Sequence, residues 1–338
     1  MLATSRRIAL TNGFELKTPL LVPSVSSKGF PFLGGKVDGI SEMSIYLGIV
    51  GPALVDSLLI SAYDIHYSYL PSTDQLRVDF FESIYANPKL LLIDSGGYER
   101  GRDYDSSAVY RAPTHPKRWG AALLSATLAT LSEDVTGVLV NYDHKASYSS
   151  QIASAQAFFA KVPRFKTDIL LKPEPKQRYI DVDRLRPAMR RLAHFDVIGV
   201  TEKELGPSVL ERAATVARLR RALDDLEVDR PIHVFGSLDT LYTPLYFMLG
   251  AEVFDGLTWL RYGYHDGATI YPDAIAVLEG NLTEREDQRV ANVLVNNLRY
   301  LARLRLQMMR YLAGEGAAVF GRYAEVLESA RSAVESSL

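Results

Sequence analysis

Leu90-Leu91-Leu92-Ile93-Asp94-Ser95-Gly96-Gly97-Tyr98 is the stretch of this sequence that decides the fold. Its four consecutive aliphatic residues predict a strand that is buried on both faces, as in a parallel sheet. The strand ends on a carboxylate, a hydroxyl and two glycines. An acid at the carboxyl end of a buried parallel strand is where α/β folds place their chemistry. A helix N-cap followed by a glycine turn is the other interpretation of these residues, so the neighbouring segments decide between the two.

The rest of the chain repeats this pattern of a short apolar run followed by a longer segment with helical periodicity. Helical patterns such as Val209–Leu226 and Leu238–Leu249 separate the runs, and no glycine-rich dinucleotide-binding fingerprint follows the first run. This alternation favours an α/β fold of the (β/α)8 TIM-barrel type over an open doubly wound sheet. The predicted strands are Leu20–Val25, Leu54–Ile60, Leu90–Asp94, Gly137–Tyr142, Asp168–Lys172, Asp196–Val200, Ile232–Gly236 and Glu252–Asp255.

The alternation of apolar runs and helical patterns ends at about residue 284. Arg285–Leu312 predicts one long helix, Gly314 and Gly316 break it, and Ala317–Ser336 predicts a last helix. We therefore expect a catalytic barrel domain over residues 1–284 and a C-terminal helical extension over residues 285–338. The arginines of the long helix fit either a solvated helix face or a surface that contacts phosphate groups.

Composition and charge are those of an ordinary globular protein. Of the 338 residues, 47% are hydrophobic and 23% are charged, and the formal net charge is −2. Such a chain can bury a sizeable core and has no global nucleic-acid signature, although a local basic patch is compatible with it. The absence of cysteine excludes disulfides, thiolate nucleophiles and cysteine-ligated zinc. No apolar run approaches the ~20 residues that span a bilayer, so we expect a cytoplasmic protein with no membrane partner.

Three aspartates, Asp94, Asp143 and Asp255, follow three different predicted strands. The carboxyl ends of all barrel strands form one rim, so these side chains are expected to converge. Clustered acids repel one another and raise each other's pKa values. Separate roles explain their coexistence: a nucleophile, a general acid–base, and an acceptor for the N–H groups of a ligand. Three carboxylates with His144 would also suit Mg²⁺ or Mn²⁺, although no local motif indicates a metal.

These motifs resemble those of the tRNA-guanine transglycosylase superfamily, whose members exchange a guanine in a polynucleotide for a 7-deazaguanine through a covalent glycosyl-enzyme intermediate. Asp94–Tyr98 is similar to the family's Asp-Ser-Gly-Gly-aromatic motif and is the most specific match. Order and spacing agree from about residue 5 to residue 272. The other matching segments are Leu16–Pro23 with its Thr-Pro…Pro pattern, Tyr142-Asp143, Ile198–Glu202 and Gly250–Asp255.

The resemblance implies a role for each site residue. Asp255 would attack the anomeric carbon of the target nucleotide, and Asp94 would move protons at the departing and incoming bases. Asp143 would accept two N–H groups from the Watson–Crick edge of guanine. The other expected base-binding residues are Ser95, Gly96, Tyr98, Lys172 and the backbone of Gly199, and the expected contacts to nucleic acid are Arg261, Arg299 and Arg303.

The chain also departs from the family pattern. Where the family has a zinc subdomain after the barrel, this chain has residues such as Val295–Leu301, with no cysteine and no histidine, so we expect no zinc cofactor. Lys172 stands where the family has a base-contacting glutamine. It fits a donor to a base carbonyl, a partner of an aspartate, a phosphate contact or a plain surface lysine. These departures indicate a divergent member and favour DNA slightly over tRNA as the polymer.

Other functions stay open at this point. The same barrel and pocket would serve a non-catalytic subunit that binds a base or a nucleic acid in a modification complex. The same carboxylates would serve a metal-dependent barrel hydrolase. The expected partners are DNA or tRNA, a 7-deazaguanine base and, in the subunit interpretation, another protein chain. His233 lies inside a predicted strand and is interpreted as a core histidine whose polar atoms are satisfied.

Overall fold

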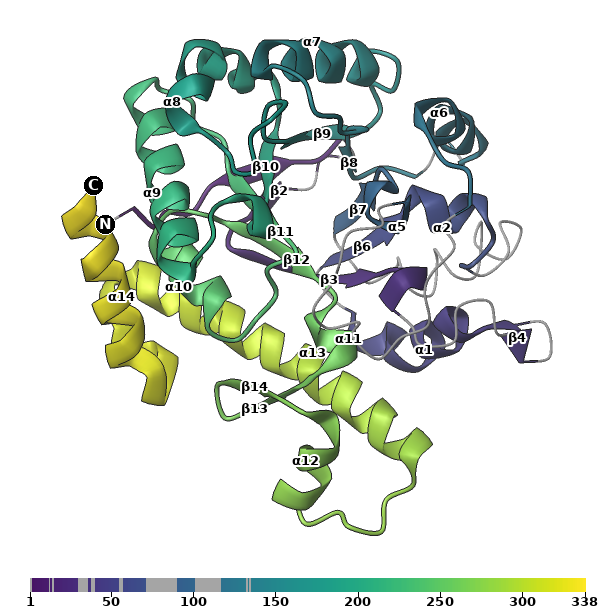
Figure 1. Ribbon diagram of the computed structural model, residues 1–338. Coiled ribbons are helices and arrows are strands. Elements are labelled where there is room, and N and C mark those ends of the chain that lie inside the picture. Colours follow the sequence, from purple (N-terminus) through teal and green to yellow (C-terminus); the bar gives the residue numbers. More distant parts are fainter. Residues whose placement is uncertain are drawn as a thin grey trace.

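The computed structural model describes residues 2–11, 13, 15–29, 36–37, 40–54, 57–70, 90–100, 117–131, 133 and 135–338. Its centre is a closed barrel of eight parallel strands, each paired with the next strand of the barrel and the last paired with the first (Figure 1). The predicted (β/α)8 barrel is confirmed, and every predicted strand overlaps an observed one. The barrel strands are β3 (Leu20–Val25), β6 (Ser57–Ser61), β7 (Leu90–Asp94), β8 (Val138–Val140), β9 (Lys166–Leu171), β10 (Val197–Thr201), β11 (Ile232–Phe235) and β12 (Val253–Gly256).

Helices surround the barrel and connect consecutive strands (Figure 1). The hydroxyl of Ser147 accepts the backbone N–H of Ser150, and the hydroxyl of Ser208 accepts that of Glu211, so each serine caps the helix that follows it. Within the described residues, no helix combines the length and apolar character needed to cross a membrane. The helices of this layer include α1 (Glu42–Val50), α2 (Ala62–His66), α5 (Gly97–Arg100), α6 (Ala121–Thr130), α7 (Tyr148–Phe159), α8 (Val182–Leu185), α9 (Val209–Asp225), α10 (Tyr242–Met248), α11 (Thr258–Arg261) and the 3₁₀ segment Arg186–His194.

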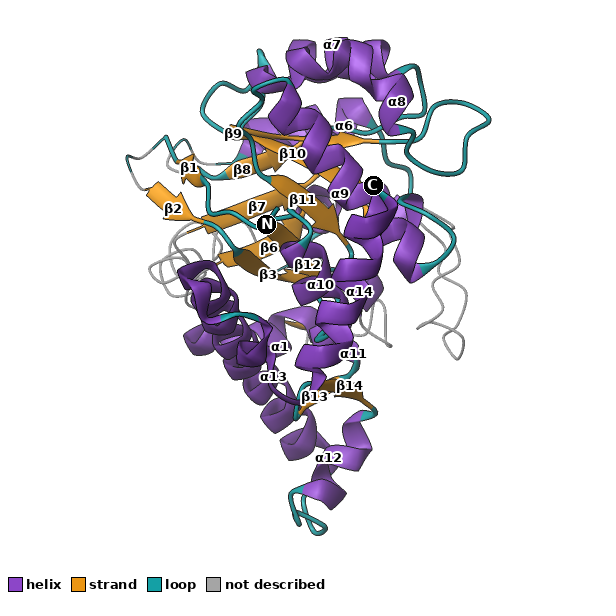
Figure 2. Ribbon diagram, turned by 90° about the vertical axis from the view of Figure 1, so that its left-hand side faces the viewer, coloured by secondary structure: helices purple, strands orange, loops and turns teal. Residues whose placement is uncertain are grey.

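A short hairpin closes the amino end of the barrel. Alternate residues of the barrel strands form one buried apolar cluster with Ile8 and Leu16. These two residues come from the antiparallel pair β1 (Arg7–Ala9) and β2 (Glu15–Lys17), which lies at one end of the barrel in Figure 2 and leads directly into β3. The opposite end, where the barrel strands finish, is therefore the end that carries the candidate site.

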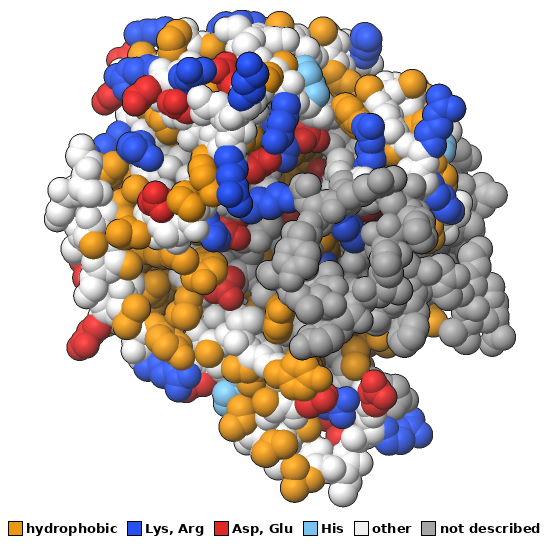
Figure 3. Space-filling view, viewed as in Figure 1, with side chains coloured by type: hydrophobic (Ala, Val, Ile, Leu, Met, Phe, Trp, Pro, Cys, Tyr) orange, Lys and Arg blue, Asp and Glu red, His pale blue; other side chains and the backbone are white. Residues whose placement is uncertain are grey.

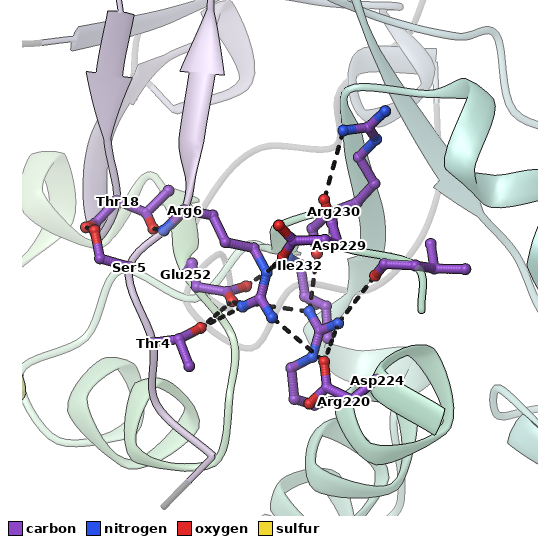
Figure 4. Close-up of polar contacts among 11 residues, drawn as sticks. Thr4, Ser5, Arg6, Thr18, Arg220, Asp224, Asp229, Arg230, Ile232 and Glu252 are labelled. Atoms are coloured by element: carbon purple, nitrogen blue, oxygen red, sulfur yellow. Dashed lines mark hydrogen bonds and ion pairs between the residues drawn. The ribbon is translucent and has the colours of Figure 1, made fainter. Parts of the chain in front are cut away.

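A buried ion cluster ties the N-terminal segment to the same amino end (Figure 4). Glu252, just before β12, is fully buried and pairs with Arg6 and with Arg220 of α9. Its carboxylate also accepts the backbone N–H of Ile232 at 2.7 Å, and Arg6 Nε lies 2.7 Å from Asp229. In TIM barrels this end of the strands serves stability rather than chemistry, and the cluster fits that role.

The C-terminal extension packs along the barrel. Helix α13 (Glu286–Arg310) confirms the predicted long helix and contacts α1, α11 and β3. Its Arg305 donates hydrogen bonds to the backbone carbonyls of Lys17 and Pro19. A domain boundary at residue 284 stays a prediction. After α13 the chain forms a π turn (Tyr311–Glu315), a 3₁₀ segment (Ala317–Tyr323) and the last helix, α14 (Ala324–Ser337).

A hairpin and a short helix project from the barrel between β12 and α13 (Figures 1 and 2). Apolar side chains on and around the helix are exposed, and Figure 3 shows hydrophobic side chains over the same projection. The most exposed of them are Tyr271, Val277 and Leu282. The projecting elements are β13 (Gly263–His265), β14 (Ala268–Ile270) and α12 (Pro272–Leu278); another short pair, β4 (Lys36–Val37) and β5 (Ile40–Ser41), follows β3.

Candidate active site

The Asp94–Tyr98 motif forms a tight turn at the carboxyl end of β7. Asp94 Oδ2 accepts the backbone N–H of Gly96 at 2.9 Å, and the short helix α5 starts one residue later, so the motif serves both as a strand end and as a helix entry. Gly96 has a φ of +85°, and a β-carbon there would lie 2.8 Å from the β-carbon of Tyr63 and closer still to the Trp119 indole nitrogen. Only glycine fits this position. The Trp119 N–H donates to the Ser95 carbonyl at 2.8 Å and fastens the turn.

Asp94 has a strongly raised pKa. Burial and the charge of Glu99, with smaller contributions from Asp143 and Asp255, outweigh the hydrogen bond from Gly96 and raise the pKa of Asp94 to about 8. Asp143 and Asp255 thus both lie within electrostatic range of Asp94. This raised pKa favours the protonated form of Asp94, which is the form that a general acid needs.

Asp255 is surrounded by donors. The Ser24 hydroxyl donates to Oδ2 at 2.6 Å, and the backbone N–H of Gly236 donates to Oδ1 at 3.1 Å. His233 Nε2 lies 3.2 Å from the same Oδ1. Hydrogen bonds and a nearby cation favour the charged form of a carboxyl group, so the surroundings of Asp255 suit an oriented carboxylate.

Asp143 and Lys172 form an ion pair beside the motif. Lys172 Nζ lies 3.5 Å from Asp143 Oδ2, 3.0 Å from Glu204 Oε2 and 2.9 Å from the Thr201 hydroxyl. Burial lowers the pKa of Lys172, but Asp143 and Glu204 outweigh it, and the pKa lies above its ordinary value. A β-carbon at Gly97 would lie 2.7 Å from Asp143 Oδ1, so this carboxylate lies directly against the turn. Of the interpretations of Lys172, the aspartate partner is the one observed.

Tyr98 and Arg261, predicted from distant parts of the sequence, meet at the carboxyl ends of β7 and β12. Arg261 donates a hydrogen bond of 2.9 Å to the Tyr98 hydroxyl. Lys28 Nζ lies 4.3 Å from the centre of the Tyr98 ring and donates to the Tyr98 carbonyl at 2.8 Å. The Tyr98 residue is 37% exposed, which leaves room for contact with a ligand. Acidic and basic side chains intermingle over the barrel on the face shown in Figure 3.

Four other predicted site residues make none of the contacts described above for the aspartates, Lys172, Tyr98 and Arg261. Ser95 is fully buried, and its hydroxyl has no hydrogen-bond partner among the described residues. A β-carbon at Gly199 would lie 2.5 Å from the Phe235 ring, so this ring fills the space beside the Gly199 backbone. Arg299 and Arg303 are exposed on α13, where Arg299 lies 3.5 Å from Asn296 Oδ1 and Arg303 lies over the Tyr300 ring. Their predicted contact with nucleic acid stays a prediction.

The described part of the chain contains no group of three or more histidine or acidic side chains arranged to hold a metal ion. The carboxylate of Asp143, one of the acids expected at such a site, is paired with the Lys172 ammonium group instead.

No model of a known protein family matches this chain, and no curated protein matches it significantly. A function therefore has to be inferred from the chemistry of the site.

Three residues that sequence reasoning missed surround the candidate nucleophile: Ser24, Asp168 and His233. Each is a polar residue inside a buried barrel strand, and a polar group in such a strand requires a partner; this was the available signal. The interpretation of His233 as a core histidine is correct for its burial. It was wrong in taking the polar atoms as satisfied: Nδ1 bonds Asp168, whereas Nε2 lies 3.2 Å from Asp255 Oδ1 and has no hydrogen-bond partner among the described residues.

Proposed function

We propose that this chain is a base-exchange transglycosylase that replaces guanine in a nucleic acid with a 7-deazaguanine base. The observation that carries the proposal is a pair of aspartates with different surroundings on one barrel rim. Asp94 has a pKa of about 8 and suits an acid, whereas Asp255 accepts two hydrogen bonds, lies 3.2 Å from His233 Nε2 and suits an oriented nucleophile. Retaining glycosidases divide the same two roles between two carboxyl groups.

Two half-reactions follow from this division. In the first, a lone pair of an Asp255 oxygen forms a bond to the anomeric carbon while the bond from that carbon to guanine breaks. The departing guanine takes the electron pair of the broken bond and the proton of Asp94. In the second, a ring nitrogen of the incoming base bonds to the anomeric carbon and gives its proton to Asp94. The electron pair of the bond between Asp255 and the carbon then returns to the carboxylate.

The pair of Asp143 and Lys172 supports guanine as the base. The Watson–Crick edge of guanine presents a carbonyl acceptor beside two N–H donors. The pair presents an ammonium donor beside a carboxylate acceptor, 3.5 Å apart. Adenine presents an amino group where guanine has its carbonyl oxygen, so the ammonium group would face a donor. A base read in this way must first leave its stack, and Tyr98 offers a ring to stack on while Arg261 offers a cation for phosphate.

We propose DNA as the first candidate for the polymer and tRNA as the second, with no zinc cofactor. The support is the C-terminal region, where α13 is a continuous helix without cysteine or histidine. In the transglycosylases that this chain resembles, the zinc subdomain in this region supports docking of the nucleic acid, so its replacement favours a polymer other than tRNA.

The full chain should be incubated with labelled guanine or a labelled 7-deazaguanine and, in separate arms, with tRNA, duplex DNA and single-stranded DNA. We expect label in one polymer and a covalent adduct between protein and polymer that Asp255→Asn does not form. Asp143→Asn should weaken base binding. Lys161→Ala, at an exposed lysine just after α7, should leave exchange unchanged and is the control for surface substitutions.

Three results would contradict the proposal. Binding of a polymer without label or adduct would favour a non-catalytic subunit. Loss of activity in EDTA with recovery in Mg²⁺ would favour a metal-dependent hydrolase. No incorporation into any of the polymers would remove the base-exchange activity itself.

A further inference from the structure

His233 of β11 bridges two carboxylates inside the barrel. Its Nδ1 lies 2.7 Å from Oδ2 of Asp168 on β9, and its Nε2 lies 3.2 Å from Oδ1 of Asp255 on β12. The side chains of His233 and Asp168 have no exposed surface, whereas 8% of the Asp255 side chain is exposed. The bridge therefore runs from the closed interior to Asp255, the one side chain of these three that solvent reaches.

Gly199 makes this bridge possible. Strand β10 separates β9 from β11, and Gly199 is the β10 residue in register with Leu170 on one side and His233 on the other. A β-carbon at Gly199 would lie 2.8 Å from Asp168 Oδ1 and 2.5 Å from the Phe235 ring. Because this position has no side chain, Asp168 reaches His233 across β10. The Phe235 ring stacks on the imidazole with 3.7 Å between ring centres.

A position between two carboxylates favours the charged form of the imidazole. The neutral ring has one N–H donor, and its other nitrogen would turn a lone pair toward a carboxylate. The protonated ring can donate toward both. Burial lowers the pKa of His233, but the charges of Asp168 on β9 and Asp255 on β12 outweigh it and raise the pKa to about 9.

We propose that His233 is a positioning residue for Asp255: the charged ring, oriented by Asp168, fixes the position of the Asp255 carboxylate. This inference rests on the proposed function, in which Asp255 is the nucleophile. Asp255 and Asp94 repel each other, and a cation on the buried side of Asp255 offsets that repulsion. Neither His233 nor Asp168 touches the reacting atoms.

The test compares the wild-type chain with His233→Gln and Asp168→Asn. His194→Gln is the matched control, because His194 is an exposed histidine at the end of the 3₁₀ segment before β10. One measurement follows the imidazole of His233 by NMR with labelled histidine, at pH values on both sides of about 9. The other follows covalent adduct formation in a single turnover with the polymer that accepts label.

We expect His233 to titrate near 9 in the wild type and at a lower pH in Asp168→Asn. Loss of a residue that orients a metal ligand typically costs about 10- to 100-fold in activity, and we expect the same order for a residue that orients a nucleophile. Adduct formation should slow by this factor in both variants, while the KM for the base stays unchanged. Asp168→Asn keeps the size of the side chain. It therefore tests the same interaction if His233→Gln does not fold. His194→Gln should match the wild type in both measurements.

A wild-type His233 that titrates at the ordinary 6.5 would overturn the inference, as would an adduct rate in His233→Gln equal to that of the control. A wild-type chain that forms no adduct with any polymer would refute the proposed function separately. In that case the titrations of the wild type and Asp168→Asn still decide whether His233 is a charged bridge.

Discussion

Asp94 and Asp255 carry the same chemical group, and their neighbours make the two different. Asp94 lies near Glu99 and accepts the backbone N–H of Gly96 in its own turn. Asp255 accepts a hydroxyl and a backbone N–H and lies against a charged imidazole. The first environment raises the pKa of Asp94, and the second holds Asp255 in one orientation through hydrogen bonds. Base exchange requires this division between an acid and an oriented nucleophile.

The rate of adduct formation should depend on the proton of Asp94. As the pH rises through about 8, Asp94 loses its proton and can no longer protonate the departing guanine, so the single-turnover rate should fall. Asp94→Asn should slow the reaction by about 10²- to 10⁴-fold and remove this pH dependence. A wild-type rate that rises through the same range would contradict the assignment of Asp94 as the acid.

At the scale of residues, the sequence allowed the carboxylates to be predicted and left their partners unknown. The convergence of Asp94 and Asp255 could be predicted because the carboxyl ends of all barrel strands share one rim. The contact between Asp168 and His233 depends on the register of three strands and on the missing side chain of Gly199. Pairing register is not encoded in any single segment, so no local pattern reveals this contact.

At the scale of elements, the turn after β7 is the most constrained piece of the site. Gly96→Ala should lower the free energy of unfolding by at least about 2 kcal/mol, because alanine is strained at a positive φ and its β-carbon would collide with Trp119 and Tyr63. Gly48→Ala is the matched control. Gly48 lies in α1 with open space around it, so alanine should stabilise the helix by about 0.5 to 1 kcal/mol.

Denaturant unfolding of both variants measures these effects. Equal stability of Gly96→Ala and the wild type would show that the turn tolerates a side chain, and the tight fit around Gly96 would then have no energetic consequence.

The barrel strands were predictable because each is a short, nearly continuous apolar run between helical patterns. The hairpins β1–β2 and β13–β14 were not predicted. Their strands have three residues each, and a run of that length carries too little periodicity to be recognised. The projection that contains α12 was missed for a related reason, since its exposed apolar side chains resemble those of a buried helix in sequence.

At the scale of the whole molecule, the ion cluster around Glu252 should be a large contributor to stability. Arg6→Ala leaves the buried Glu252 carboxylate with weaker compensation, and breaking a buried pair of this kind costs roughly 3 kcal/mol. The control is Arg7→Ala. Arg7 pairs with Glu15 in an exposed position, and such surface pairs contribute less than about 1 kcal/mol. Equal unfolding free energies of the two variants, measured with denaturant, would contradict this role for the cluster.

The stability of the whole fold should fall as the solution becomes alkaline. The pKa of His233 is raised from 6.5 to about 9 by folding, so its stabilising contribution is fully present below pH 6.5 and is lost as the pH rises through 9. Asp94, raised from 3.8 to about 8, acts in the same direction. Denaturant unfolding at a series of pH values should therefore give a decreasing free energy over this range, with a weaker decrease in His233→Gln. A wild-type value that increases would contradict the raised pKa values.

The pairing of β3 with β12, which closes the barrel, has a consequence for folding during synthesis of the chain. It joins Leu20–Pro23 to Val253–Gly256, and the contact of Arg6 with Glu252 spans 246 positions of the chain. During synthesis, β3 can pair with β6 but its other edge stays open until β12 has left the ribosome, and an open edge invites pairing with the wrong strand. In a nascent chain that stops before β12, the barrel is not closed. Arg6 then also lacks its ion-pair partner, Glu252. The last barrel strand to be made therefore closes the barrel.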